Sequence, residues 1–490
     1  MQNSDLQQVL ALRQAILNGD EKRLEQQRDA GKRTARERVL KLLDAGSFVE
    51  LFALLSEAGK GAGVVTGYGT VGDRPVYVFA QDFTVHGGAM GTAQAAKIGK
   101  LLDMALKTGA PVIALCDSAG VRLDEGAAGM NAYAEIYQKM ARMSGVCPMI
   151  AVVLGSCVGG AALMAQLADI SIMAKDVGQM MMFGPQVLAA MTGANVNAKA
   201  DGGADMMAAQ GGCALTADNE EDAMAIAVRL LSLLPSSNLE DAEIIDSDDM
   251  NRLLPAIDPE NTGALMKAIA DAGSVLELYP AYEPGICVAL ARLGGRTVGL
   301  VATGKGALTA SALRKAARFV RLMDCYNIPV VSLINTRGVQ VPDVRAQSAL
   351  MIAQSQLLYA YAEATVPKLA VVTGDAIGQA YVAMGGKANA DITYAWPSAV
   401  ISALTPEAAV AVLYADEVKG DKALSVEEAR IKYAGEYVRD VAGAVNAAKA
   451  GLLDDIIDPA QTRALLISAL EMLAGKRDSN PPKKHGNLPL

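Results

Sequence analysis

Two glycine-rich turns are the stretches of this chain best suited to stabilise a negative charge. The first, GSCVGGAAL at 155–163, follows the uncharged run PMIAVVL, and the second, GDAIGQAYV at 374–382, follows PKLAVVT. In each, a buried strand is expected to end where a run of small residues begins a helix. The first N–H groups of a helix have no partner within it, so two of them can hold an oxyanion. A phosphate loop and a purely structural close turn are the alternatives.

Motifs that would give these turns a different chemistry are missing from the sequence. Neither GxxxxGK[S/T] nor a GxGxxG that opens a helix after a strand occurs, which disfavours nucleotide binding. Ser118 lacks the GxSxG context of a serine hydrolase, and the chain has only two histidines, His86 and His485. A catalytic triad is therefore disfavoured. The proton acceptor of any reaction is expected to come from a substrate or a cofactor.

The composition excludes several classes of protein. A net charge of −9 over 490 residues argues against a nucleic-acid binder, which would gather Lys and Arg. The six cysteines form no CxxC pair, so we expect buried, reduced thiols, no metal site and a cytoplasmic location. The opening residues are polar and acidic, and no signal peptide is expected. The uncharged run 149–166 is interpreted as a buried strand, turn and helix rather than a membrane span.

The chain repeats itself about 220 residues apart, a period that fits two homologous domains rather than a solenoid. Four blocks recur in the same order, each as a strand bounded by turn residues. The pairs are GDRPVYVFA with GGRTVGLVA, APVIALCDSAGVR with IPVVSLINTRGVQ, PMIAVVLGSCVGG with PKLAVVTGDAIGQ, and ADISI with ADITY. Short β-branched runs alternate with helical runs in both halves, which predicts an α/β fold with parallel strands.

Local signals place several boundaries. A helix is expected to end at Gly109, a suitable C-cap, before the strand PVIALC. The first 45 residues are predicted to form separate amphipathic helices, with a capping box of Thr34 and Glu37 in TARE. The turn-rich, acidic stretch 233–249 is expected to join the two halves, and the proline-rich tail to be extended.

Motifs over essentially the whole chain resemble the carboxyltransferase subunits of biotin-dependent acyl-CoA carboxylases and decarboxylases. Those motifs are GKRTARERVLKLLDAGSFVEL, QDFTVHGGAMG, DSAGVRLDEG, LLYAYAEATVPK, AYVAM, YAWPSA and PPKKHGNLPL. The resemblance implies a tandem duplication of two crotonase-like domains. Residues 1–245 would then bind the acyl-CoA, residues 246–490 would bind biotin, and the active site would lie between domains of different subunits of a hexamer.

The resemblance also implies roles for the turns. The N–H groups of Gly160 and Ala161 would hold the thioester enolate, and those of Gln379 and Ala380 the ureido oxygen of biotin. Biotin's own ureido nitrogen would exchange the proton, which explains why the sequence offers no base. The further residues implied in substrate binding are Gly120, Val121, Arg122, Gly159, Gly378, Tyr381 and Val382.

Some residues depart from the family's usual pattern. Gln379 stands where a second glycine is usual, which is expected to narrow the biotin pocket. The loop 335–348 differs from the family's, and the apolar Val382 favours a short acyl group, without choosing between acetyl and propionyl. Arg122 would bind a CoA phosphate or the substrate carboxylate, or form an ordinary surface salt bridge.

No lysine lies in a biotin-attachment context, so biotin is expected on a separate carrier protein, with a biotin carboxylase or a membrane decarboxylase subunit as a further partner. The sequence does not separate carboxylation from decarboxylation. Two other functions remain open. One is a biotin-independent crotonase-like hydratase or hydrolase, which would need Asp124 and Glu125 as a carboxylate pair. The other is a non-catalytic acyl-CoA-binding scaffold.

Overall fold

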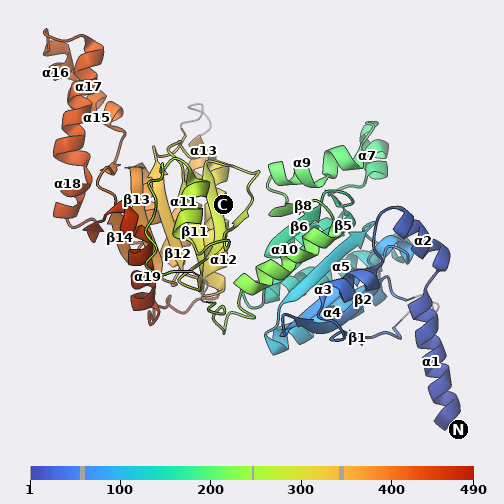
Figure 1. Ribbon diagram of the computed structural model, residues 1–490. Helices are drawn as coiled ribbons and strands as arrows, with labels where there is room; N and C mark the ends of the chain where they lie inside the picture. The colour runs from blue at the N-terminus through green and yellow to red at the C-terminus, as the bar shows by residue number, and fades with distance from the viewer. Residues whose placement is uncertain (1, 56–60, 246–247, 341–346, 490) are drawn as a thin grey trace. The chain divides into compact units, whose positions relative to one another are not determined.

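The computed structural model describes residues 2–55, 61–245, 248–340 and 347–489. They fold into two compact units, residues 1–241 and 242–490, coloured blue to green and green to red in Figure 1. Each unit has its own eight-stranded sheet with helices packed on it, so the predicted α/β class is confirmed.

The sheet of the first unit is parallel except at one edge, where β1, β2 and β3 are antiparallel. Its order is β1-β2-β3-β4-β5-β6-β8, and β7 pairs with the end of β5. The strands are β1 (Val49–Leu51), β2 (Val64–Val71), β3 (Arg74–Gln81), β4 (Val112–Ser118), β5 (Met149–Val158), β6 (Ile170–Ala174), β7 (Gln179–Met181) and β8 (Leu215–Ala217). The central β4 is buried at every residue, as expected of a parallel strand covered on both faces.

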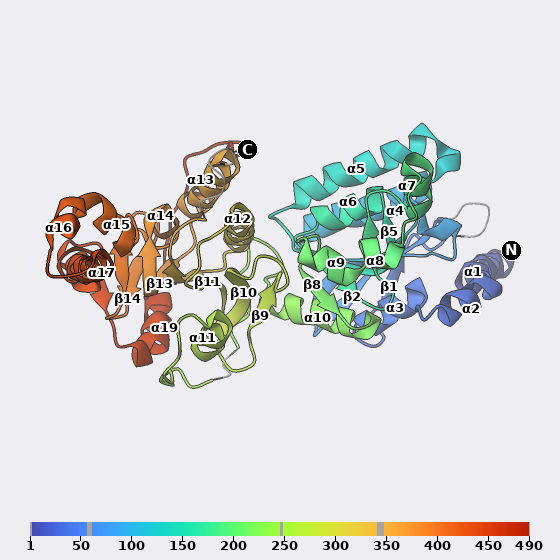
Figure 2. The same cartoon turned by 90° about the horizontal axis from the view of Figure 1, so that it is seen from above.

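Helices cover both faces of this sheet (Figure 2). The helices of the first unit are α1 (Gln2–Asn18), α2 (Glu21–Asp29), α3 (Ala35–Leu42), α4 (Thr92–Thr108), α5 (Ala127–Met143), α6 (Gly160–Leu167), α7 (Pro185–Thr192), α8 (Ala198–Gly202), α9 (Ala204–Ala209) and α10 (Glu220–Leu233), and α1 projects away from the sheet (Figure 1). Buried residues of α4, α5 and α6 form one core with alternate residues of β4 and β5. Helices α3 and α10 contact each other and also pack on the sheet.

The second unit repeats this plan. Its sheet order is β16-β14-β13-β12-β11-β10-β9, and β15 pairs with the end of β13. The strands are β9 (Leu276–Leu278), β10 (Ile286–Leu293), β11 (Arg296–Thr303), β12 (Val330–Thr336), β13 (Lys368–Ile377), β14 (Ile392–Ala395), β15 (Val400–Ser402) and β16 (Asp455–Ile456). The helices are α11 (Thr262–Ile269), α12 (Ala310–Cys325), α13 (Gln347–Glu363), α14 (Gly378–Gly385), α15 (Pro406–Leu413), α16 (Ala415–Gly420), α17 (Val426–Tyr437), α18 (Ala444–Lys449) and α19 (Thr462–Leu473).

Even the irregularities of the two sheets correspond. The register between β4 and β5 shifts between Cys116 and Ser118, and that between β12 and β13 shifts between Ile334 and Thr336, the matching residues of the repeat. Each unit also has an isolated parallel β-bridge that involves the loop after its central strand. The bridge joins Met90 to Val121 after β4, and Leu308 to Val339 after β12. The two halves therefore share one backbone plan, as the tandem duplication predicts.

The units differ between their last two strands. The second carries α15, α16, α17 and α18 there, of which α15, α16 and α17 lie together at one end of the unit in both views (Figures 1 and 2). The first carries the shorter α7, α8 and α9. A small separate core holds α15, α16 and α17 together around Val410, Val418, Ala429 and Tyr437, while α18 contacts β15 and β16.

Several local predictions can be compared with the structure. Gly109 caps α4 in the left-handed region at φ 67°, and Thr34 and Glu37 form both bonds of the capping box. The run 149–166 is a strand, a glycine turn and a helix. In the part of the chain that is described, no helix combines the length and apolarity of a membrane span. The amphipathic prediction holds for α3 but is wrong for α1, whose described side chains are almost all exposed.

Candidate functional site

The first glycine turn joins β5 to α6 at the carboxyl edge of the sheet. Gly159 has φ 59° and ψ −121°, a conformation that only glycine adopts easily, and its N–H donates to Met181 O at 2.9 Å. The next N–H groups belong to Gly160 and Ala161, the first residues of α6, where no intrahelical acceptor exists. The turn therefore directs two neighbouring donors along the start of the helix.

Two tyrosines of α5 fix this turn. A Cβ atom on Gly160 would lie 2.6 Å from the Tyr133 ring, so only glycine fits there. The Tyr137 hydroxyl donates to Gly160 O at 2.9 Å, and the two rings stack with their centroids 5.6 Å apart. Burial raises the pKa of Tyr137 to about 12, so this hydroxyl remains a neutral donor at physiological pH. The sequence analysis missed both tyrosines, which no motif marks.

The structure brings the predicted residues after β4 next to this turn. Gly120 has φ 113°, and a Cβ atom on it would lie 3.3 Å from Val158 O. The Tyr133 hydroxyl donates to Gly120 O at 3.0 Å, which links the two loops directly. Val121 forms the bridge with Met90. Gly120, Val121, Gly159, Gly160 and Ala161 therefore belong to one local constellation.

Arg122 forms ion pairs with two neighbouring carboxylates. Its Nε donates to Asp124 Oδ1 at 2.8 Å, its Nη1 lies 3.7 Å from Glu125 Oε1, and its side chain is 12% exposed. The hydrogen bond from Arg122 lowers the pKa of Asp124 to about 2. Glu125 also accepts from the Thr92 N–H at 2.8 Å. These two carboxylates are thus already engaged, which disfavours their use as the acid–base pair of a hydratase.

The second glycine turn, between β13 and α14, has the same form. Gly378 has φ 67°, and the N–H groups of Gln379 and Ala380 follow at the start of α14. Ala380 and Tyr381 are buried, and burial raises the pKa of Tyr381. Val382 is 41% exposed in this chain. The turn thus places its N–H groups like those of the first turn.

The Gln379 side chain is exposed instead of filling the turn. In the first unit the Tyr133 ring requires glycine at position 160, whereas in the second unit Gln379 stands at the matching position with its side chain exposed. Residues 341–346 of the divergent loop 335–348 lie outside the described residues.

Four charged side chains form a buried cluster behind the first turn, and no motif in the sequence marks them as partners. They are Lys32, Arg38, Asp117 and Glu220. Arg38 donates from Nη1 to Asp117 Oδ2 at 2.9 Å and from Nη2 to Glu220 Oε1 at 2.5 Å. Lys32 Nζ donates to Asp117 Oδ1 at 2.8 Å. Arg38 and Asp117 are fully buried. Burial acts to lower the pKa of Arg38, but the two carboxylates outweigh it and the pKa lies above its usual value.

This cluster connects the N-terminal segment to β4 and β5, the two strands of the first unit that lead into the candidate site. Asp117 is the penultimate residue of β4, and Arg38 Nη2 also donates to Leu154 O in β5. A Cβ atom on Gly155 would lie 2.1 Å from Asp117 Oδ1, so the first glycine of GSCVGG makes room for this carboxylate. In the second unit Asn335 takes that place beside Gly374, and its Oδ1 accepts from the Asp375 N–H at 3.0 Å.

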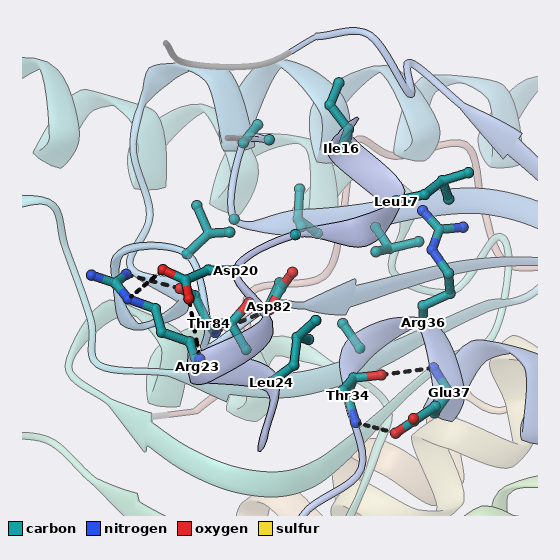
Figure 3. Close-up of a pocket in the computed structure, with 18 of the residues that line it drawn as sticks. Ile16, Leu17, Asp20, Arg23, Leu24, Thr34, Arg36, Glu37, Asp82 and Thr84 are labelled. Atoms are coloured by element: carbon teal, nitrogen blue, oxygen red, sulfur yellow. Dashed lines mark hydrogen bonds and ion pairs between the residues drawn. The ribbon is translucent and has the colours of Figure 1, made fainter. Parts of the chain in front are cut away.

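A cavity of about 540 Å³ lies in the first unit between the N-terminal helices and the loop after β3 (Figure 3). Arg23 donates across it to Thr84 O at 2.9 Å. Lys97 lines it, is 3% exposed, and donates to Val64 O at 2.9 Å. Burial lowers the pKa of Lys97 to about 8. None of the lining residues belongs to the glycine turns, so the cavity is distinct from the candidate site.

The sequence predicted buried, reduced thiols and no metal site. Five cysteines are buried as predicted, but Cys325 is exposed, so the prediction is wrong for that residue. It ends the amphipathic helix α12, whose outer face reaches solvent. Across the residues with described positions, no group of three His, Cys, Asp or Glu side chains is placed to hold a metal ion.

Comparison with known proteins gives consistent matches over the whole chain. The family model for the carboxyl transferase domain matches residues 26–488. The methylmalonyl-CoA decarboxylase subunit alpha of Veillonella parvula is 39% identical, with 96% of each chain covered. The propionyl-CoA carboxylase carboxyltransferase subunit of Haloferax mediterranei is 38% identical, with 97% of each covered. The transcarboxylase 12S structure, a hexamer with methylmalonyl-coenzyme A bound, superposes with a TM-score of 0.92 at 36% identity, over 99% of this chain and 98% of that one.

Proposed function

This chain belongs to the carboxyl transferase domain family, and we propose that it exchanges a carboxyl group between methylmalonyl-CoA or propionyl-CoA and biotin on a separate carrier protein. It is a biotin-dependent carboxyltransferase with the crotonase-like fold of transcarboxylase 12S, as the sequence resemblance predicted. The named substrates of the relatives support the choice of acyl group. Malonyl-CoA and acetyl-CoA are the second choice.

The observation that carries this proposal is the pair of equivalent glycine turns. The reaction involves two acceptor oxygens, that of the thioester and that of the ureido group, and each unit offers one turn with two convergent N–H groups. In the proposal, Gly160 and Ala161 donate to the thioester oxygen and Gln379 and Ala380 to the ureido oxygen. Such donors act strongly because they are already oriented before charge develops.

The geometry of the second turn supports binding of a ureido oxygen there. Gly378 is in a left-handed conformation, a Cβ atom on it would lie 3.4 Å from Ala403 O, and the Gln379 side chain is exposed. Bound there, biotin supplies the nitrogen that takes the carboxyl group and exchanges the proton. The chain's part is to bind both substrates, orient them and stabilise the enolate that forms at the thioester.

The first unit, residues 1–245 in our proposal, binds the acyl-CoA, and residues 246–490 bind biotin. Gly120, Val121 and Gly159 shape the acyl side, and Tyr381 and Val382 follow the biotin-side turn. The engaged Arg122 contributes to loop geometry through its pairs with Asp124 and Glu125. The hexamer of transcarboxylase 12S supports a homo-hexamer here. A biotin carboxyl carrier protein is the expected partner, and the cytoplasmic location remains a prediction.

The test is a half-reaction on the purified full chain. Methylmalonyl-CoA and, separately, malonyl-CoA are incubated with and without free biotin, and the acyl-CoA is followed by mass. Biotin-dependent loss of the carboxylate is the expected result, faster for methylmalonyl-CoA. Loss that does not depend on biotin would instead identify a crotonase-like decarboxylase, and no loss with a carrier protein present would identify a scaffold.

A pair of variants on α6 tests the role of the turn. Ala161→Pro removes one N–H donor and is expected to lower turnover at least about 100-fold. Leu163→Ala, which alters an exposed side chain of the same helix turn and keeps every N–H, is the matched control. Near-normal turnover of a folded Ala161→Pro variant would refute the assignment of the acyl-side donors.

A further inference from the structure

The two glycine turns differ in the charges beside them, although their backbones match. Arg337, in NTRGVQ, occupies the position of Ala119 in the first repeat, and Asp375 occupies that of Ser156. The shared register shift at the ends of the two central strands fixes this correspondence. The second turn has therefore gained a cation and an anion where the first has two neutral side chains.

These charges lie directly beside the second turn. A Cβ atom on Gly338 would lie 3.4 Å from the carbonyl oxygen of Ile377, so the Arg337–Gly338 peptide contacts the residue that precedes Gly378. Asp375 lies near the carboxyl end of β13, and its Oδ2 is 3.8 Å from Arg337 Nε. Asp375, on the strand that leads into the second turn, therefore helps to position the Arg337 side chain.

The Arg337 guanidinium is accessible from solvent. Its side chain is 39% exposed, and its Nη2 donates to Glu407 Oε2 at 2.6 Å, a carboxylate that is itself 66% exposed. Ion pairs between exposed groups contribute little free energy, so an incoming anion can replace Glu407. Asp375, in contrast, is only 20% exposed and remains beside the Nε edge.

A second cation, Lys305, lies close by. Lys305 follows β11 at the same edge of the sheet and pairs with Glu260 at 3.0 Å. Burial raises the pKa of Asp375, while Arg337 and Lys305 act in the opposite direction. An anion that displaces Glu407 would therefore face Arg337 and Lys305, with Glu260 and Asp375 as the remaining carboxyl groups, and Asp375 takes up a proton more readily than usual.

We propose that Arg337 binds the carboxylate group that is exchanged at the biotin side, with Asp375 orienting its guanidinium; this rests on the proposed function. A guanidinium matches a carboxylate with two parallel hydrogen bonds, which a lysine cannot reproduce. In the first turn Ala119 takes the position of Arg337, and Arg122, three residues further on, is only 12% exposed, against 39% for Arg337. Arg337 is thus a specificity-determining residue of the second turn.

The test compares an anionic and a neutral probe by equilibrium binding, without turnover. The anionic probe is biotin methyl ester with a carboxymethyl group on the ureido nitrogen, and the neutral probe is the methyl ester of that group. Their dissociation constants for the full chain are measured by ligand-observed NMR. Arg337→Ala is expected to weaken the anionic probe about 10- to 100-fold and the neutral probe less than about twofold. Arg337→Lys should lie between wild type and Arg337→Ala for the anion.

Arg439→Ala is the matched control, since Arg439 is 68% exposed, pairs with the adjacent Asp440, and belongs to the same unit. It should change neither affinity. Fluorescence of Trp396, the only tryptophan, reports whether the second unit of each variant is folded.

Three results would overturn the inference. The first is that Arg337→Ala binds the anionic probe as tightly as wild type does. The second is that Arg337→Ala and Arg337→Lys each lose affinity for both probes equally. The third is that wild type binds the neutral probe more tightly than the anionic one. Biotin-dependent decarboxylation of methylmalonyl-CoA by wild type is measured alongside. If it occurs while Arg337→Ala keeps its anion affinity, only this inference fails. If wild type neither transfers the carboxyl group nor binds either probe, the proposed function fails as well.

Discussion

Replacing Asp117 by asparagine would leave one buried positive charge without compensation. In wild type the charges of Lys32 and Arg38 are balanced by those of Asp117 and Glu220, and the contacts are 2.5–2.9 Å long. Asparagine removes one negative charge and cannot accept from both cations, because one of its two side-chain atoms is a donor. Removing one partner of a buried ion pair costs about 3–5 kcal/mol. Because Glu220 still holds Arg38, we expect a loss of about 3 kcal/mol.

The assay uses the position of the single tryptophan. Equilibrium urea unfolding is followed by far-UV circular dichroism, which reports both units, and by fluorescence of Trp396, which lies in the second unit and is buried. With a slope of about 3 kcal/mol per molar urea, the midpoint of the first unit should fall by about 1 M. The Trp396 transition should stay in place.

Asp218→Asn provides the matched control, because Asp218 pairs with Lys175 at 3.1 Å but is 81% exposed. It should change the free energy of unfolding by less than about 1 kcal/mol. A loss below about 1 kcal/mol for Asp117→Asn, or an equal shift of the Trp396 transition, would refute the reasoning about the buried charges.

Three further outcomes follow from single residues. Gly160→Ala places a Cβ atom 2.6 Å from the Tyr133 ring and should lower kcat about 100-fold in steady-state assays, whereas activity within about threefold of wild type would contradict this. Burial lowers the pKa of Lys97 from 10.5 to about 8, so between these pH values the unfolded chain binds more protons than the folded one. Wild type should therefore gain up to about 3 kcal/mol relative to Lys97→Met as the pH rises through this window, measured by urea unfolding; an unchanged difference would speak against it. A thiol reagent should modify Cys325 quickly and the other five cysteines only after denaturation, and rapid reaction of two or more native thiols would contradict the burial.

The elements that the sequence predicted well are those set by local patterns. The strands of both repeats are apolar runs that begin after proline and end at glycine, and the structure places β4, β5, β12 and β13 on them. Gly109 and the Thr34 capping box depend on neighbours in the sequence, and they form as predicted. The two turns were recognisable because the same motif occurs twice.

The contacts that the sequence did not reveal depend on residues far apart in the chain. TARER has the composition of a solvated helix, yet Arg38 reaches Asp117 and Glu220, which lie on other elements. Tyr133 is an ordinary helical aromatic until it packs on Gly160. Only tertiary structure shows that the Tyr133 ring demands glycine at the first turn, while the Gln379 side chain at the second is exposed.

The matching register shift in both sheets has a consequence for the descent of this protein. A backbone irregularity inherited in two copies was present before the gene doubled, so the ancestral single unit already had the strand ends and the turn. Divergence then changed side chains on a fixed frame, so that Ala119 and Ser156 stand in one copy where Arg337 and Asp375 stand in the other. Doubling thus allowed two copies of one turn to keep the same backbone while their surroundings came to carry different charges.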